Sequence, residues 1–259
     1  METWFDLPCA DSVIKCKLYH RESAGGPAPE FMQVRHVVLF CHGLAGHRDN
    51  AMAHKLADRI LMNHEDTVLL IFNWPGHGDD VRQALDLEDC DLYLRTILQY
   101  IRDRLQPEVL DVSATSFGGY LILKYLTDYG TSPFRRICLR CPAVVMDQVL
   151  TQVLTGDELQ TLSRGGVVPY GFDRKTDLTQ DFLDSLRQTA LFDRDVRPFS
   201  DRIVIAQGTA DELVPCEAVC AFAQRNHLRL VLVRDADHRF LDPAKMDYVL
   251  TTFLDHLGL

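Results

Sequence analysis

The chain has 259 residues, of which 47% are hydrophobic and 25% charged, enough apolar material for one large α/β domain. Its net charge of −10, with no dense block of lysine or arginine, argues against nucleic acid or an anionic membrane surface as partners, because binding would begin against electrostatic repulsion. No stretch reaches the ~18 apolar residues of a membrane span, and residues 1–6 do not read as a secretory signal, so we expect a cytoplasmic protein.

The predicted elements begin with two short segments, 3–7 and 13–20, which are followed by the breaker-rich residues 24–29. They predict an antiparallel hairpin at the edge of a sheet. Apolar runs without alternation then recur at 37–40, 68–72, 109–112, 137–139, 203–206 and 228–233. Such runs indicate strands buried on both faces, and helical spacing between several of them predicts a parallel sheet covered by helices.

One segment, 143–197, interrupts this alternation. It contains amphipathic pieces around 146–154 and 178–191 but no convincing buried strand. Because its length exceeds that of a normal crossover, we expect an inserted helical cap on a core formed by 1–142 and 198–259. The alternative is a pair of ordinary crossover helices with a long loop.

The eight cysteines are too sparse for a disulfide scaffold in a chain of this length. Cys41, Cys138 and Cys141 fall in or beside predicted strands, so we expect mostly free thiols in the core. Cys138 and Cys141 have C-x-x-C spacing, but a zinc site would need a second pair or nearby histidines. We therefore expect no metal and no cofactor.

The most informative residue is Ser116, in the sequence Ala-Thr-Ser-Phe-Gly-Gly between an apolar run and a helical pattern. A serine between small residues at a strand-to-helix junction is the layout of a nucleophile elbow. Ala114 and Gly118 lie two residues before and after it, where larger side chains would clash. Ser113 and Thr115 are alternative hydroxyls, but neither has small residues on both sides at this spacing.

A serine hydroxyl needs a base to remove its proton, usually a histidine that a carboxylate orients. Asp211 follows the strand at 203–206, and His238 follows the strand at 228–233. In a parallel sheet both loops lie at the carboxyl edge, where ligands bind. We therefore expect a triad of Ser116, Asp211 and His238.

Other residues compete for the two roles of base and acid. His42 and His77 precede glycines in turns after early strands, where structural or substrate-facing roles are expected. Glu212, Asp235 and Asp237 are alternative carboxylates, but the last two lie too close in sequence to His238 to orient it from another loop.

Stabilisation of an oxyanion is predicted at two backbone N–H groups. Acyl transfer builds negative charge on the carbonyl oxygen, and loss of one such donor typically slows the reaction by ~10² to 10³. The residue after the nucleophile, Phe117, offers one N–H. Leu44, which follows His42 and Gly43 at the end of the strand at 37–40, offers the other.

Together these motifs resemble the α/β-hydrolase superfamily over essentially the whole chain. Residues 73–79 look like its Gly-x-Gly loop, and residues 208–215 look like its acid-loop signature. The resemblance implies a mostly parallel eight-stranded sheet flanked by helices, with an inserted helical cap. Within the superfamily the chain is similar to the monoacylglycerol-lipase-like and cinnamoyl-esterase-like carboxylesterases and to related serine peptidases.

The expected function is that of a serine hydrolase that cleaves a small-molecule carboxylic ester through an acyl-enzyme. A peptidase, a thioesterase or an acyltransferase could use the same triad, so these activities stay open. A binding protein without catalytic activity is a further alternative, because a fold does not dictate a function. Such a protein would be expected to lose a triad residue, whereas all three are present here. The sequence does not indicate an oligomeric state.

Overall fold

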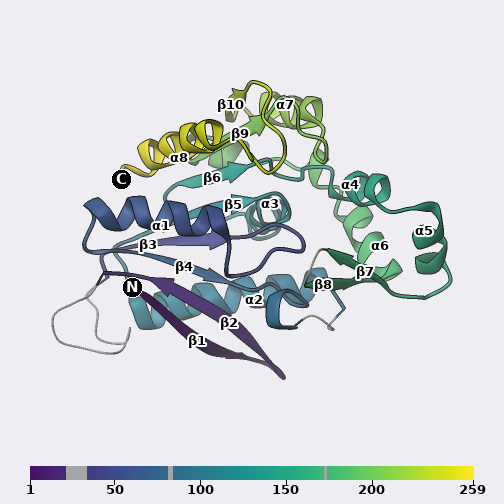
Figure 1. Cartoon of the computed structure of the whole chain (residues 1–259), viewed down its shortest axis with the longest axis horizontal. Coiled ribbons are helices and arrows are strands. Elements are labelled where there is room, and N and C mark those ends of the chain that lie inside the picture. Colours follow the sequence, from purple (N-terminus) through teal and green to yellow (C-terminus); the bar gives the residue numbers. More distant parts are fainter. Residues whose placement is uncertain (22–33, 81–83, 172–173) are drawn as a thin grey trace.

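The structure is a computed structural model that describes residues 1–21, 34–80, 84–171 and 174–259. The predicted breaker segment at 24–29 lies outside these ranges. The described strands form an eight-stranded sheet in the order β1-β2-β4-β3-β5-β6-β9-β10 and a separate pair, β7 and β8 (Figure 1). Their bounds are β1 Glu2–Cys9, β2 Ser12–Tyr19, β3 His36–Cys41, β4 Thr67–Phe72, β5 Val109–Thr115, β6 Ile137–Arg140, β7 Val168–Gly171, β8 Lys175–Leu178, β9 Ile203–Gly208 and β10 Arg229–Val233.

The predicted mostly parallel eight-stranded sheet is confirmed. Strands β4, β3, β5, β6, β9 and β10 pair in parallel, whereas β1 and β2 form an antiparallel hairpin that joins the sheet through β2 and β4. The hairpin lies at one edge of the sheet, as its short, turn-separated segments predicted.

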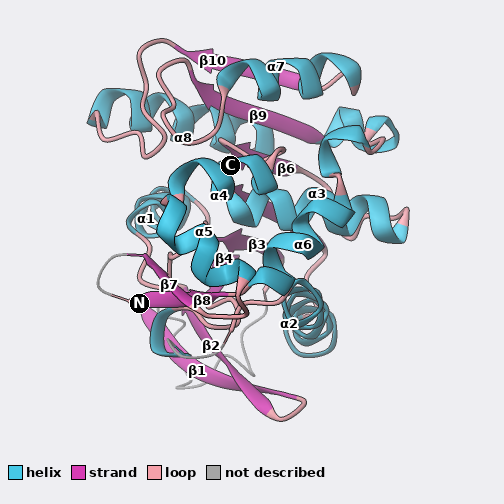
Figure 2. Ribbon diagram, turned by 90° about the vertical axis from the view of Figure 1, so that its right-hand side faces the viewer, coloured by secondary structure: helices cyan, strands magenta, loops and turns pink. Residues whose placement is uncertain are grey.

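Helices cover both faces of the sheet, with α1 and α8 on one side and α2 and α3 on the other (Figure 2). On β3, Val38 and Phe40 pack in the cluster that holds α1 and α8, whereas Val37 and Leu39 pack with α2 and α3. Every β3 residue is buried, which explains the continuous apolar run. The helix bounds are α1 Ala51–Asn63, α2 Leu87–Tyr100, α3 Phe117–Tyr129, α4 Met146–Val153, α5 Gly156–Ser163, α6 Gln180–Thr189, α7 Cys216–Arg225 and α8 Pro243–Leu257.

The segment between β6 and β9 holds α4, α5, β7, β8 and α6, and lies beyond the tips of β3 and β4 (Figure 1). Helices α4 and α6 fall within the amphipathic stretches of the sequence, but the β7–β8 hairpin was not indicated there. This hairpin contacts the core through hydrogen bonds: Thr176 Oγ1 donates to the Gly76 carbonyl (3.0 Å), and the Leu85 N–H donates to the Asp177 carbonyl (2.9 Å).

All eight cysteines are free, and six of them are buried. No helix within the described ranges has the length and apolar character that crossing a bilayer requires.

Candidate active site

Ser116 forms a strained turn between β5 and α3. Its backbone has φ +53° and ψ −115°, which is unusual for a residue with a side chain. The Ser116 N–H donates to the carbonyl of Arg140 at the end of β6 (2.9 Å). A Cβ on Gly118 would lie 2.3 Å from the carbonyl oxygen of Cys41, so only glycine fits two residues after the serine. The turn therefore has the close approach that the sequence predicted.

Asp211 and His238 meet at the carboxyl ends of β9 and β10. Nδ1 of His238 lies 3.0 Å from Oδ1 and 2.9 Å from Oδ2 of Asp211. The Asp211 side chain is fully buried, and the N–H groups of Leu213 and Val214 donate to its Oδ1 (3.0 and 2.8 Å). Gln207 Nε2 donates to its Oδ2 (2.9 Å). The loop is therefore built to hold an ionised carboxylate against the imidazole.

The charge of Asp211 is stabilised by these donors. Burial by itself would raise the pKa of the carboxyl group, but the contact with His238, the Val214 N–H and the neighbouring Cys141 thiol hold this pKa below its ordinary value. An ionised Asp211 can orient the imidazole and stabilise its cation when His238 accepts a proton.

The two predicted oxyanion donors lie in turns next to the serine. A Cβ on Gly43 would lie 3.2 Å from the Cβ of Ser116, so the turn that contains Leu44 passes directly beside the elbow. Phe117 begins α3, where the first N–H groups of a helix have no acceptor within the helix. Within the described ranges, neither the Leu44 nor the Phe117 N–H donates to another protein group.

Ser116 and His238 lie at the same edge of the sheet, but no hydrogen bond joins Ser116 Oγ to the imidazole in the part of the chain that the structure describes. Their backbones are linked through Arg140: its carbonyl accepts from the Ser116 N–H, and its Nη1 donates to the His238 carbonyl (2.9 Å). Bonds between nucleophile and base often tighten only when substrate is bound.

The competing histidines have structural contacts. Nδ1 of His42 bonds to the Gly43 carbonyl (2.8 Å), and the Trp74 N–H donates to His42 Nε2 (3.4 Å). Nδ1 of His77 bonds to the Pro75 carbonyl (2.8 Å). Burial lowers the pKa of both rings, for His77 to about 4. Within the described ranges neither ring pairs with a carboxylate, so neither has the partner that a triad base requires.

The competing carboxylates also have other partners. Glu212 Oε2 accepts from the His238 N–H (3.1 Å), which makes it a support for the backbone of this loop. Asp237 Oδ1 accepts from the Arg239 N–H (2.8 Å) and so caps the following turn. The roles of Gln207, Glu212 and Arg140 were not predicted from the sequence. The signal for Gln207 and Arg140 was a polar residue at the end of an apolar strand.

One group of ligand-type side chains among the described residues could hold a metal: Cys141 Sγ, an Asp211 oxygen and a His238 nitrogen lie within 4.8 Å of one another. Burial raises the pKa of the Cys141 thiol well above its ordinary value. The carboxylate already accepts from His238, Gln207 and two backbone N–H groups. This group is therefore the acid–base pair of the candidate triad with a neutral thiol beside it.

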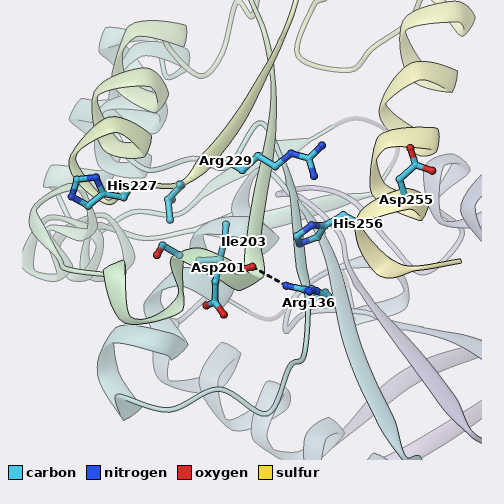
Figure 3. A pocket seen from close by; sticks show the side chains of 9 residues that line it. Arg136, Asp201, Ile203, His227, Arg229, Asp255 and His256 are labelled. Carbon is cyan, nitrogen blue, oxygen red and sulfur yellow. Dashed lines mark hydrogen bonds between the residues drawn. The ribbon is translucent and has the colours of Figure 1, made fainter.

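A cavity of about 530 Å³ lies at the opposite edge of the sheet (Figure 3). Its lining includes Arg136 before β6, Ile203 at the start of β9 and Arg229 at the start of β10, which together mark the amino edge. The lining contains two arginines, Arg136 and Arg229, and two aspartates, Asp201 and Asp255, so these four groups together carry no net charge. This cavity is separate from the edge where Asp211 and His238 meet.

Comparison with known proteins identifies the class. A model of the alpha/beta hydrolase family matches residues 38–247. Among solved structures, Est1E from Butyrivibrio proteoclasticus with bound ferulic acid has a TM-score of 0.72 at 15% identity, covering 98% of this chain and all of the other. XC6422 from Xanthomonas campestris, described as a serine hydrolase without a lid, has a TM-score of 0.62 at 15% identity, covering 99% of this chain and 94% of the other.

A larger protein is also similar in fold. The acylaminoacyl peptidase of Pyrococcus horikoshii has a TM-score of 0.64 at 13% identity, and the match covers all of this chain but 41% of the peptidase. No curated protein matches the sequence. The fold and the family match together show that this chain belongs to the alpha/beta hydrolase family.

Proposed function

We propose that this protein is a serine hydrolase that cleaves carboxylic esters, with Ser116 as nucleophile, His238 as base and Asp211 as the orienting acid. The observation that carries the proposal is the Asp211–His238 pair, in which a fully buried carboxylate holds Nδ1 of the imidazole at 2.9 and 3.0 Å. Nε2, on the other side of the ring, has no bond to another described residue and is available to Ser116.

The reaction proceeds in two halves. His238 Nε2 takes the proton of Ser116 Oγ while this oxygen attacks the ester carbonyl carbon, and the N–H groups of Leu44 and Phe117 bind the oxyanion. The tetrahedral intermediate expels the alcohol, which leaves with the proton from His238. Water then gives a proton to His238 and attacks the acyl-Ser116 carbonyl, and collapse releases the acid and returns the proton to Ser116.

The segment 143–197 is proposed to act as a cap over this site. Its hairpin reaches the turn that carries an oxyanion donor: a Cβ on Gly171 would lie 2.8 Å from the Cβ of Ala45, next to Leu44. Est1E, which is similar to this chain in fold, holds ferulic acid in its structure. We infer that a small carboxylic ester enters between the cap and the carboxyl edge of the sheet.

The test is a fluorophosphonate probe, which reacts with an activated serine, together with hydrolysis of p-nitrophenyl acetate. We expect the wild type to be labelled on Ser116, and Ser116→Ala to lose labelling and to lose about 10⁶-fold in kcat with folding unchanged. Asp211→Asn should lose about 10⁴-fold in kcat, because the imidazole of His238 then adopts the wrong tautomer.

The matched control is Ser113→Ala, because Ser113 is the alternative serine and its buried Oγ has no partner in the described ranges. This variant should keep full activity and labelling. An unlabelled wild type, or Ser116→Ala with undiminished ester hydrolysis, would show that the triad does not work as proposed. A panel of aryl, short-chain, long-chain, thioester and peptide substrates then tests the ester assignment, and faster cleavage of the peptide would overturn it.

A further inference from the structure

Arg140, the last residue of β6, lies between the strands that lead to the nucleophile and to the acid. In the sheet it pairs with Thr115 at the end of β5 on one side and with Ala206 of β9 on the other. Ser116 directly follows β5, and Asp211 lies three residues beyond the end of β9. This position brings one residue into reach of all the loops that carry the candidate triad.

Two contacts connect Arg140 to the triad. Its carbonyl accepts from the Ser116 N–H at 2.9 Å, and its guanidinium Nη1 donates to the His238 carbonyl at 2.9 Å. Glu212 accepts from the His238 N–H on the other side of the same residue (3.1 Å). The backbone of His238 is therefore held at both its N–H and its carbonyl.

Burial of the Arg140 guanidinium costs free energy of folding. Arg140 is 7% exposed, its Nε has no hydrogen-bond partner in the described ranges, and no carboxylate there lies within ion-pair distance. Burial lowers the pKa of Arg140, but a guanidinium stays protonated in proteins. A buried charge of this kind commonly contributes less to stability than an apolar side chain of similar volume would. Stability alone does not account for an arginine here.

The groups that act on Arg140 electrostatically belong mostly to the site. The carboxylates of Asp211 and Asp237 favour its charged form, and Arg239 opposes it. The ring of Phe240 has its centroid 5.5 Å from the guanidinium carbon. The guanidinium is therefore stabilised by carboxylates of the two loops that carry Asp211 and His238.

We propose that Arg140 is a positioning residue of the triad, whose carbonyl fixes the Ser116 backbone and whose guanidinium fixes the His238 backbone. The inference rests on the proposed function. Nη1 holds the His238 carbonyl while Glu212 holds the His238 N–H, so the imidazole is kept in one orientation against Asp211. Loss of the Nη1 donor should therefore lower kcat and leave KM nearly unchanged.

The experiment compares Arg140→Met, which keeps an apolar stem, with Arg140→Lys, which keeps the charge. For p-nitrophenyl acetate we expect Arg140→Met to lose about tenfold to a hundredfold in kcat with little change in KM, because the imidazole is no longer held in place. Arg140→Lys, whose Nζ is a cationic donor that can still bond to the His238 carbonyl, should keep most of kcat.

The matched control is Arg136→Met, which removes an arginine four residues earlier, just before β6 at the amino edge, where its Nη1 bonds to the Asp201 carbonyl. This control should leave kcat, KM and the Nδ1 proton signal unchanged. Thermal unfolding should show Arg140→Met to be as stable as the wild type or more stable. An Arg140→Met variant with unchanged kcat, or an equal loss of kcat in the control, would overturn the inference.

A readout without turnover separates this inference from the proposed function. The proton on Nδ1 of His238 in its bond to Asp211 gives a low-field NMR signal, and its chemical shift should change in Arg140→Met alone, because the imidazole is no longer held against the carboxylate. If the wild type hydrolyses no ester but this chemical shift changes, the proposed function fails and the role of Arg140 stands. If the wild type is active and the chemical shift stays fixed, the role of Arg140 fails alone.

Discussion

Two histidines outside the proposed triad, His42 and His77, are fully or almost fully buried in neighbouring turns with their rings 5.3 Å apart. Burial is the main cause that lowers the pKa of each ring, and for His77 the folded-state pKa is about 4. In the unfolded chain a histidine has a pKa of about 6.5. Between these two values the unfolded state holds more protons than the folded one, so acid favours unfolding.

We therefore predict that the free energy of unfolding is constant above the unfolded-state pKa and decreases as the pH falls from ~6.5 toward 4. His77 should contribute a slope of at most about 1.4 kcal/mol per pH unit. Urea denaturation at pH 7, 6 and 5 measures this slope. His77→Asn should reduce this slope by the contribution of one titrating histidine. His54→Asn, at an exposed site, serves as the control. Equal slopes in wild type and His77→Asn would contradict the prediction.

At the scale of elements, the approach of α3 to β3 depends on Gly118. Substitution of Gly118 by alanine has two opposing effects on stability. Alanine gains about 1 kcal/mol over glycine in a helix, but its Cβ would meet the Cys41 carbonyl oxygen at 2.3 Å and the His42 carbonyl oxygen at 2.6 Å. Both atoms are backbone at the end of a central strand and cannot move aside cheaply, so the clash outweighs the gain.

Gly118→Ala should lower the free energy of unfolding by about 1–3 kcal/mol. It should also displace the turn that carries Ser116, which should lower kcat about a hundredfold. Gly156→Ala is the matched control, because Gly156 also lies in the first turn of a helix, α5, and an added Cβ there meets nothing within 4 Å. Urea denaturation and ester hydrolysis measure both variants. A Gly118→Ala variant as stable and active as Gly156→Ala would show that the helix can shift without cost.

The sequence predicted the central strands β3, β4, β6 and β9 well because every residue in them is buried, which favours runs of apolar side chains. The edge strand β10 is apolar in sequence but mostly exposed or half-buried. It did not predict the β7–β8 hairpin, since β7 contains Pro169 and Gly171 and β8 is largely polar. This hairpin depends on contacts with distant residues, such as the bond from Thr176 to the Gly76 carbonyl. Local propensity carries no signal for such contacts.

At the scale of the whole molecule, the order of the strands places the proposed site at one edge of the sheet. The sequence predicted the loops of Ser116, Asp211 and His238 as candidates because each follows a recognisable strand. The structure brings Asp211 and His238 into contact, and the catalytic roles of the three residues stay a prediction. Residues that support these loops were harder to predict. Arg140 and Gln207 act across neighbouring strands, and the sequence alone did not show which strands are neighbours.

The contact between the 143–197 segment and the core can be tested at Thr176, which is 1% exposed. Thr176→Val keeps the shape of the side chain but removes the donor to the buried Gly76 carbonyl. An unpaired buried carbonyl costs about 1–3 kcal/mol, and this cost falls on the docked hairpin and not on the central strands. We expect faster amide hydrogen exchange in β7 and β8, with β3, β4 and β5 unchanged.

Because the same hairpin touches Ala45, next to the proposed oxyanion donor Leu44, kcat for ester hydrolysis should fall together with this protection. Thr151→Val is the matched control, since Thr151 lies in α4 of the same segment and its hydroxyl bonds within that helix, to the Asp147 carbonyl. It should change neither exchange in the hairpin nor kcat. Faster exchange in Thr176→Val with unchanged kcat would mean that the hairpin covers the edge of the sheet without supporting the oxyanion turn.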